Sequence, residues 1–177
     1  ADASGNLLTA SGGTVALSST GSATIGAVTD NGNGTYTATV TNTVAESVTI
    51  SGTLDGAAIT DTATITFTVG AADPTNGNTT LVAAPTSVVA DGATTSSVTV
   101  TLADANGNLL TASGGTVALS STGSATIGAV TDNGNGTYTA TVTNTVAESV
   151  TISGTLDGAA ITDTATIAFT VGAADPT

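Results

Sequence analysis

The sequence predicts an all-β protein made of tandem antiparallel β-sandwich domains. Three observations support this prediction: a long internal repeat, apolar residues that alternate with polar ones, and Gly-rich turn signals at short intervals. Seven or eight short alternating strands over about a hundred residues are typical of a β-sandwich. No segment shows the 3.6-residue apolar period of an amphipathic helix.

The repeat is the strongest of these observations. Residues 1–75 align with residues 103–177 without a gap, and only two pairs of positions differ. These are Ser4 against Asn106 and Thr66 against Ala168. Near-identity of this kind indicates a recent duplication of one unit.

The repeat predicts two domains of unequal completeness. Residues 76–177 form a complete repeat, whereas residues 1–75 form a repeat that lacks its N-terminal strands. The first domain is therefore either cut from a longer array or completed by another chain through strand addition. A linker is expected around 71–78, where Pro74 favours extended geometry in the residue before it.

Period-two alternation locates the strands of the complete copy. Their apolar residues share one face, and the exchange of Thr66 for Ala168 falls on the opposite, outward face. Strands are expected at 97–102, 137–142, 149–152 and 164–171.

Turn signals separate these strands. Asp-Gly and Asn-Gly pairs favour hairpin turns because both residues accept a positive φ. Pro85 predicts an edge strand or a bulge, since proline cannot donate to a sheet. The turn signals lie at 91–92, 104–108, 113–115, 132–136 and 157–158.

Composition excludes most functions. The 177 residues include no Cys, His, Lys or Arg, and the net charge is −13. Imidazole bases, thiolate nucleophiles and phosphate clamps are therefore absent from the sequence, and we do not expect an enzyme. The negative charge also argues against nucleic acid or an anionic membrane as a partner. No apolar run is long enough for a membrane span, so we expect no membrane insertion in this segment.

The strand and turn motifs resemble a known family. "SVVADGATTSSVTVTLADANGNLL" (87–110), "GGTVALSS" (114–121) and "TDNGNGTYTATVT" (131–143) are similar to the bacterial immunoglobulin-like repeats of the invasin and intimin type. The resemblance covers the whole repeat unit. Family members usually contain some Lys and Arg, and this chain departs from them in having none.

The resemblance implies immunoglobulin-like sandwiches and a structural role at the bacterial cell surface. Such repeats form extracellular stalks of large adhesins and hold an adhesive domain away from the cell. The expected function is thus a spacer repeat of an adhesin stalk or surface filament. The expected partners are neighbouring repeats of the same protein or another copy of the chain. A carbohydrate- or protein-binding immunoglobulin-like module is the alternative, although aromatic residues, which usually supply such contacts, are few.

Two Asp-containing loops are candidates for metal sites. Asp104, Asn106 and Asn108 place oxygens at positions 1, 3 and 5, as in a calcium loop, but Leu109 stands where an EF-hand needs Gly. The alternative interpretation is a strand-to-strand loop with Asx-type turns. The stretch "DNGNG" at 132–136 has Gly at its positions 3 and 5 and is interpreted as a turn that starts a strand.

Three weaker hypotheses remain. Asp73 and Asp175 each offer a linker carboxylate that can join those of a neighbouring domain around an interdomain calcium ion. Glycosylation sequons occur at Asn78 and Asn135, the latter repeated in the first copy. Tyr36 and Tyr138 are expected to pack in the core with their hydroxyl groups bonded to backbone. We assign no catalytic, cofactor-binding or metal-binding residue, and no cofactor is required; calcium is the only one considered.

Overall fold

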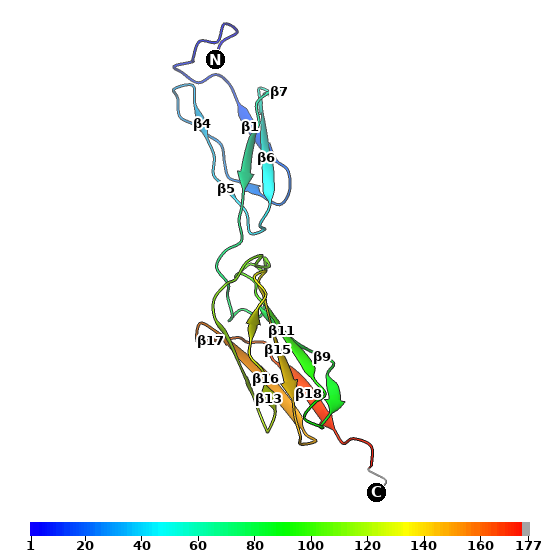
Figure 1. Cartoon of the computed structure of the whole chain (residues 1–177). Coiled ribbons are helices and arrows are strands. Elements are labelled where there is room, and N and C mark those ends of the chain that lie inside the picture. Colours follow the sequence, from blue (N-terminus) through cyan, green and yellow to red (C-terminus); the bar gives the residue numbers. More distant parts are fainter. Residues whose placement is uncertain (175–177) are drawn as a thin grey trace. The chain divides into compact units, whose positions relative to one another are not determined.

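The chain folds into two compact units in the computed structural model, which describes residues 1–174 (Figure 1). The first unit is Ala1–Thr68 and the second begins at Val69. The structural boundary therefore lies before the repeat boundary at 75–76, and residues 69–75 belong to the second unit. In residues 1–174 there is no helix long and apolar enough to cross a membrane.

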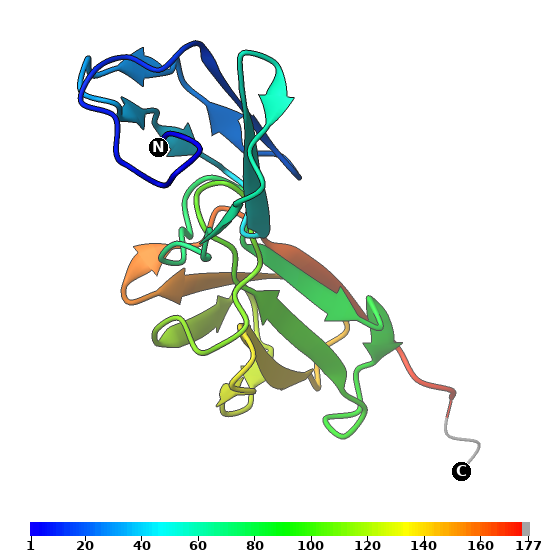
Figure 2. The same ribbon diagram turned by 90° about the horizontal axis from the view of Figure 1, so that it is seen from above.

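The second unit is a two-layer β-sandwich. One sheet has the strand order β13-β15-β11-β9, with β14 paired to β15, and the other has the order β10-β18-β16-β12, with β17 paired to β16. In Figure 2, the green strands β9 and β11 belong to the first of these sheets, and the orange β16 and red β18 belong to the second. Its strands are β9 Thr80–Ala84, β10 Ser87–Val89, β11 Ser96–Thr101, β12 Val117–Ser121, β13 Thr126–Ile127, β14 Thr131–Asp132, β15 Thr137–Thr143, β16 Ser149–Leu156, β17 Ala159–Ala160 and β18 Ala165–Thr170.

These strands confirm the period-two alternation predicted from the sequence. One strand pair, however, is parallel where an antiparallel sandwich was predicted. β10 pairs with β18 in parallel, while the other strand pairs of the unit are antiparallel. The difference arises at Pro85, where a short connection carries the chain from the edge of one sheet to the edge of the other. β9 and β10 are both edge strands, as Pro85 predicted.

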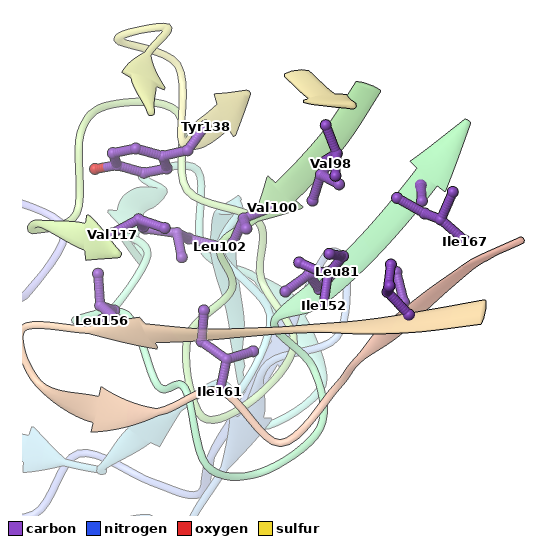
Figure 3. Close-up of a cluster of buried hydrophobic side chains, with 14 of the residues drawn as sticks. Leu81, Val98, Val100, Leu102, Val117, Tyr138, Ile152, Leu156, Ile161 and Ile167 are labelled. Carbon is purple, nitrogen blue, oxygen red and sulfur yellow. The ribbon is translucent and has the colours of Figure 1, made fainter. Parts of the chain in front are cut away.

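The core of the second unit lies between the two sheets. β11 contributes Val98 and Val100, which are fully buried, and β9 contributes Leu81. Figure 3 shows Leu81 lying beside Ile152 of the opposite sheet, in one cluster with Ile161. Because the side chains are small and mostly aliphatic, burial depends on both sheets being complete.

The first unit has the same order of elements but no counterparts of β9, β10 and β11. β1 and β6 pair as β12 and β16 do, whereas the counterpart of the continuous β15 is split into two short strands. Its strands are β1 Val15–Ser19, β2 Thr24–Ile25, β3 Thr29–Asp30, β4 Tyr36–Thr37, β5 Val40–Thr41, β6 Ser47–Leu54, β7 Ala57–Ala58 and β8 Ala63–Thr66. Because the two sequences are nearly identical, the split reflects the missing partner strand and not local propensity.

The two copies offer a matched test of core packing. Ile161 of the second unit is 4% exposed, and its counterpart Ile59 is 40% exposed. Ile161→Ala should lower the free energy of unfolding of the second unit by about 2–5 kcal/mol, because it leaves a cavity. Ile59→Ala should cost at most about 1 kcal/mol in the first unit. Denaturant unfolding followed by NMR resolves the two units, and equal costs would contradict this difference in packing.

Candidate functional site

The most highly connected polar group of the described chain is the Asp104 carboxylate. It lies in the loop after β11 and is only 3% exposed. Its Oδ1 accepts hydrogen bonds from the backbone N–H groups of Asn106 and Asn108, both at 2.9 Å. Its Oδ2 accepts one from the Asn108 side-chain amide and one from the Gly70 N–H, also both at 2.9 Å.

The Gly70 bond attaches the last residues of the first repeat to the Asp104 loop of the second unit. Residues Gly70–Pro74 line one side of a pocket of about 400 Å³, and Asp104–Asn106 line the other. Ala72 forms a β-bridge with Asp104, and the Asp73 N–H donates to the Ala103 carbonyl. Farther along, the Thr162 N–H donates to the Pro74 carbonyl. The expected linker at 71–78 is therefore largely a built-in part of the second unit.

The geometry of the Asp104 loop differs from that of a calcium loop. In a calcium site, oxygens from several residues converge on the ion. Here the Asn108 side chain turns its N–H group toward Asp104, and N–H donors approach both carboxylate oxygens. No group of three or more acidic side chains suited to a metal ion occurs in residues 1–174. The arrangement serves to organise the loop and to bind the preceding segment.

The same contacts determine the acidity of Asp104. The Asn108 side-chain amide and then the Gly70 N–H stabilise the charged form and lower the pKa of the Asp104 carboxyl to about 2. Hydrogen bonds from Thr94 do the same for Asp91 in the β10–β11 connection, whose pKa is also lowered to about 2.

Asp2 is the counterpart of Asp104 in the first unit. It accepts hydrogen bonds from the N–H groups of Ser4 and Asn6 and from the Asn6 side-chain amide. The loop therefore forms by itself, and the exchange of Asn106 for Ser4 does not disturb it because only the backbone N–H of that position is used. Asp2 is exposed, since no segment equivalent to Gly70–Pro74 lies over it in the described residues.

The "DNGNG" stretch is a turn that starts β15, as predicted. Gly134 and Gly136 both have a positive φ. Asp132 accepts from the Gly134 N–H at 2.8 Å, and Asn135 accepts from both the N–H and the hydroxyl of Thr137. The Ser113 hydroxyl is the main cause of the lowered pKa of Asp132. All these polar groups are thus engaged in fixing the turn.

Tyr138 occupies the position expected of it. Its ring is buried, and its hydroxyl donates to the Gly115 carbonyl at 2.7 Å while accepting from the Gly114 N–H at 3.1 Å. These bonds fasten the 113–115 turn to β15. Tyr36 makes the same pair of bonds in the first unit.

The structure describes only one of the two linker carboxylates that were considered for an interdomain calcium site. Asp73 accepts from the N–H and the hydroxyl of Thr75, both at 2.8 Å. Asp175 lies outside the described residues. Calcium binding by these two groups therefore remains a sequence-based hypothesis.

Sequence reasoning missed the residues that hold the N-terminal edge of the second unit. Thr79 is fully buried, and its hydroxyl donates to the Asp73 carbonyl. The Leu81 N–H donates to the Asp163 carboxylate at 2.9 Å, across 82 positions of sequence. No local pattern marks the second contact, because Asp163 is 82 positions from Leu81.

The two sheets and their turn contacts define an immunoglobulin-like β-sandwich. The family model of invasin domain 3 matches residues 1–70 and again residues 75–172. The chain therefore belongs to the invasin domain 3 family, and the resemblance noted from its motifs is confirmed.

Solved structures of bacterial adhesins support this assignment. FdeC, an Escherichia coli adhesin, matches with 28% identity and a TM-score of 0.63 over 97% of this chain and 56% of its own. InvD of Yersinia pseudotuberculosis matches with 30% identity and a TM-score of 0.57 over 99% of this chain and 52% of its own. Invasin, a bacterial integrin-binding protein, matches with 28% identity and a TM-score of 0.57 over 89% of this chain and 32% of its own. The chain thus spans about a third to a half of the length of these relatives.

The role of Asp104 can be tested against its own counterpart. Asp104→Ala should lower the Tm of the second unit by roughly 4–8 °C, because it leaves buried N–H donors without an acceptor. Asp2→Ala should change the Tm of the first unit much less, because solvent reaches the same donors there. Faster amide hydrogen exchange at Gly70 in Asp104→Ala should accompany the loss. Unchanged exchange at Gly70 would contradict the described attachment.

The lowered pKa of Asp104 predicts a pH dependence. Its folded pKa of about 2 lies below the ordinary value of 3.8, so its contribution to stability is complete above about pH 4 and disappears as the pH falls toward 2. Relief of charge repulsion acts in the opposite direction on the whole chain, so Asp104→Asn is the reference. The stability difference between wild type and Asp104→Asn should be constant above pH 4 and should narrow below it, as measured by thermal melts. A difference independent of pH down to 2 would refute the prediction.

Proposed function

We propose that this chain is a pair of spacer repeats in the stalk of an extracellular bacterial adhesin or surface filament. The observation that carries the proposal is that two copies of one repeat follow each other, with residues 1–75 nearly identical to residues 103–177, and that residues 70–74 at the end of the first copy are bonded to the second unit. Membership of a family found in adhesins supports a location at the cell surface. Rigid domains joined without a long flexible segment are suited to setting a distance.

The surface chemistry is consistent with this role. The chain has no cationic side chain to pair with its thirteen carboxylates, so neighbouring stalks repel one another. In the complete unit, both aromatic side chains, Tyr138 and Phe169, are 3% exposed. That unit therefore presents no aromatic platform for a sugar ring or a protein hot spot. For the same reasons, together with the absence of His, Cys and Lys, we propose a non-enzymatic protein.

Surface display tests the proposal directly. One, two or four copies of the chain are placed between a bacterial outer-membrane anchor and an adhesive tip of known ligand. The distance of the tip from the membrane should grow in proportion to the number of copies, and each added copy should contribute at least the length of the eight-residue strand β16, roughly 27 Å. A Gly/Ser linker of equal residue number is the control, because its span should grow only as the square root of its length.

Display of the chain without a tip distinguishes the spacer from a binding module. Bacteria that carry the anchored chain alone should not adhere to host cells or to a glycan array. Saturable adhesion of these tipless bacteria would instead establish the binding module and would overturn the proposed role.

A further inference from the structure

Asn-Gly pairs are frequent in this chain, and the fold protects them to different degrees. An asparagine before a glycine is prone to lose its side-chain amide, because glycine has no Cβ to keep its backbone nitrogen away from the asparagine side chain. The pairs begin at Asn31, Asn33, Asn76, Asn106, Asn133 and Asn135. Since all six share the same dipeptide, differences in their reactivity have to come from the folded structure.

Three of the pairs are protected by a hydrogen bond from the glycine N–H. Gly134 donates to the Asp132 carboxylate at 2.8 Å, and Gly32 makes the same bond in the first copy. Gly107 donates to the Asp104 carbonyl at 3.0 Å. Removal of the proton from such a nitrogen breaks the bond and brings a new negative charge close to an oxygen acceptor. The glycine nitrogens of these pairs are therefore held back from reaction.

Two further pairs are protected by close packing of the glycine. Gly136 is buried, and a Cβ on it would collide with the Leu110 carbonyl. Gly34 is placed in the same way against the Leu8 carbonyl in the first copy. The backbone of these glycines has little room to turn toward the side chain of the preceding asparagine.

The pair Asn76–Gly77 has neither kind of protection. Gly77 is exposed at a φ of +82°, and a Cβ on it would meet no atom closer than 4.0 Å. Within residues 1–174, its N–H makes no hydrogen bond. The Asn76 Oδ1 accepts from the Asn78 N–H at 3.0 Å, in a turn that folds the side-chain amide back over the Gly77 peptide. The same N–H can stabilise the negative charge that develops on Oδ1 when the adjacent carbon is attacked.

We propose that Asn76 is a site of spontaneous modification in the folded chain and is converted to aspartate and isoaspartate faster than the other five asparagines. The Gly77 nitrogen gives its proton to hydroxide and attacks the Asn76 Cγ. A bond forms between that nitrogen and Cγ, the bond from Cγ to Nδ2 breaks, and Nδ2 leaves as ammonia after taking a proton from water. Water then opens the succinimide ring at either of its carbonyls, and no oxidant or reductant takes part. This inference does not depend on the spacer role.

The conversion changes the segment that joins the repeats. The Asn76 Nδ2 donates to the Asp104 carbonyl at 3.4 Å. A carboxylate oxygen in its place is an acceptor that faces another acceptor, and it adds a negative charge three positions from Asp73. Isoaspartate also adds a carbon to the main chain between Asp73 and Thr79, whose hydroxyl donates to the Asp73 carbonyl. The modification should therefore loosen the attachment of residues 70–79.

The test follows the six asparagines while the folded chain is incubated at neutral pH. Peptic digestion in acid needs no Lys or Arg, and mass spectrometry then locates each conversion by the gain in mass when NH₂ is replaced by OH. Asn76 should convert at least fivefold faster than any other asparagine of the six. In denaturant, where the protecting contacts are absent, the six rates should become similar.

Asp132→Ala supplies a matched control within one molecule. It removes the acceptor of the Gly134 N–H, so Asn133 should convert at least threefold faster while the rate at Asn76 stays the same. Asn31 keeps its protecting Asp30 and should remain slow. The substitution also gives the Asn133 peptide a different mass from the Asn31 peptide, which otherwise has the same sequence.

Two substitutions at position 76 test the site and its consequence. Asn76→Ser copies the exchange of Asn106 for Ser4 between the repeats and should abolish the fast conversion. Asn76→Asp reproduces one product and should speed amide hydrogen exchange at Asp73, whose N–H donates to the Ala103 carbonyl. Unchanged exchange in Asn76→Asp would refute the loosening of the segment.

The rates themselves decide the assignment of the site. Equal conversion of all six asparagines in the folded chain would overturn it, because the fold would then give no protection. Faster conversion at Asn33 and Asn135 than at Asn76 would also overturn it, since close packing of the glycine would not be protective. A rate at Asn76 that is lower in the folded chain than in denaturant by the same factor as the others would count against it equally.

Discussion

Every carboxylate in this protein must be stabilised without a cationic side chain, and this constraint organises the structure. The chain has no Lys, Arg or His, so hydrogen bonds from backbone N–H groups take the place of salt bridges. Asp104, Asp91 and Glu148 each accept such bonds at a loop or turn. Asp157 accepts from Thr116 and Asp163 from Leu81, each far away in sequence. These acidic residues therefore hold loops and strands of the sandwich together through hydrogen bonds. In residues 1–174, no buried polar side-chain atom lacks a hydrogen-bond partner.

Local patterns were sufficient to predict the strands and turns whose structure is determined locally. The alternation around Tyr138 marked β15, and the Asp-Asn-Gly stretch before it marked the turn, because positive φ at Gly134 and Gly136 is a local requirement. The tyrosine was expected to bond to backbone, and it does. The motifs also pointed to the correct family, since they occur in the same order over the whole repeat unit.

Features that depend on distant partners could not be predicted in this way. The parallel pairing of β10 follows from the crossing between sheets at Pro85, which no residue pattern encodes. The bonds of Asp104 to Asn106 and Asn108 are local, whereas its bond to Gly70 joins residues that are 34 positions apart and follows no local spacing. The clearest case is β15 itself, because the same seven residues form one continuous strand in the second unit and two fragments in the first. The length of this strand therefore depends on whether a neighbouring strand pairs with it, and not on its own residues alone.

The attachment of residues 70–79 to the second unit has a mechanical consequence. Tension along the chain reaches that unit through the hydrogen bonds of Gly70, Asp73 and Pro74 before it reaches the core strands. The ten residues behind these bonds span at most roughly 35 Å when extended. A pull that broke only these bonds would therefore lengthen the junction without unfolding the core of the second unit.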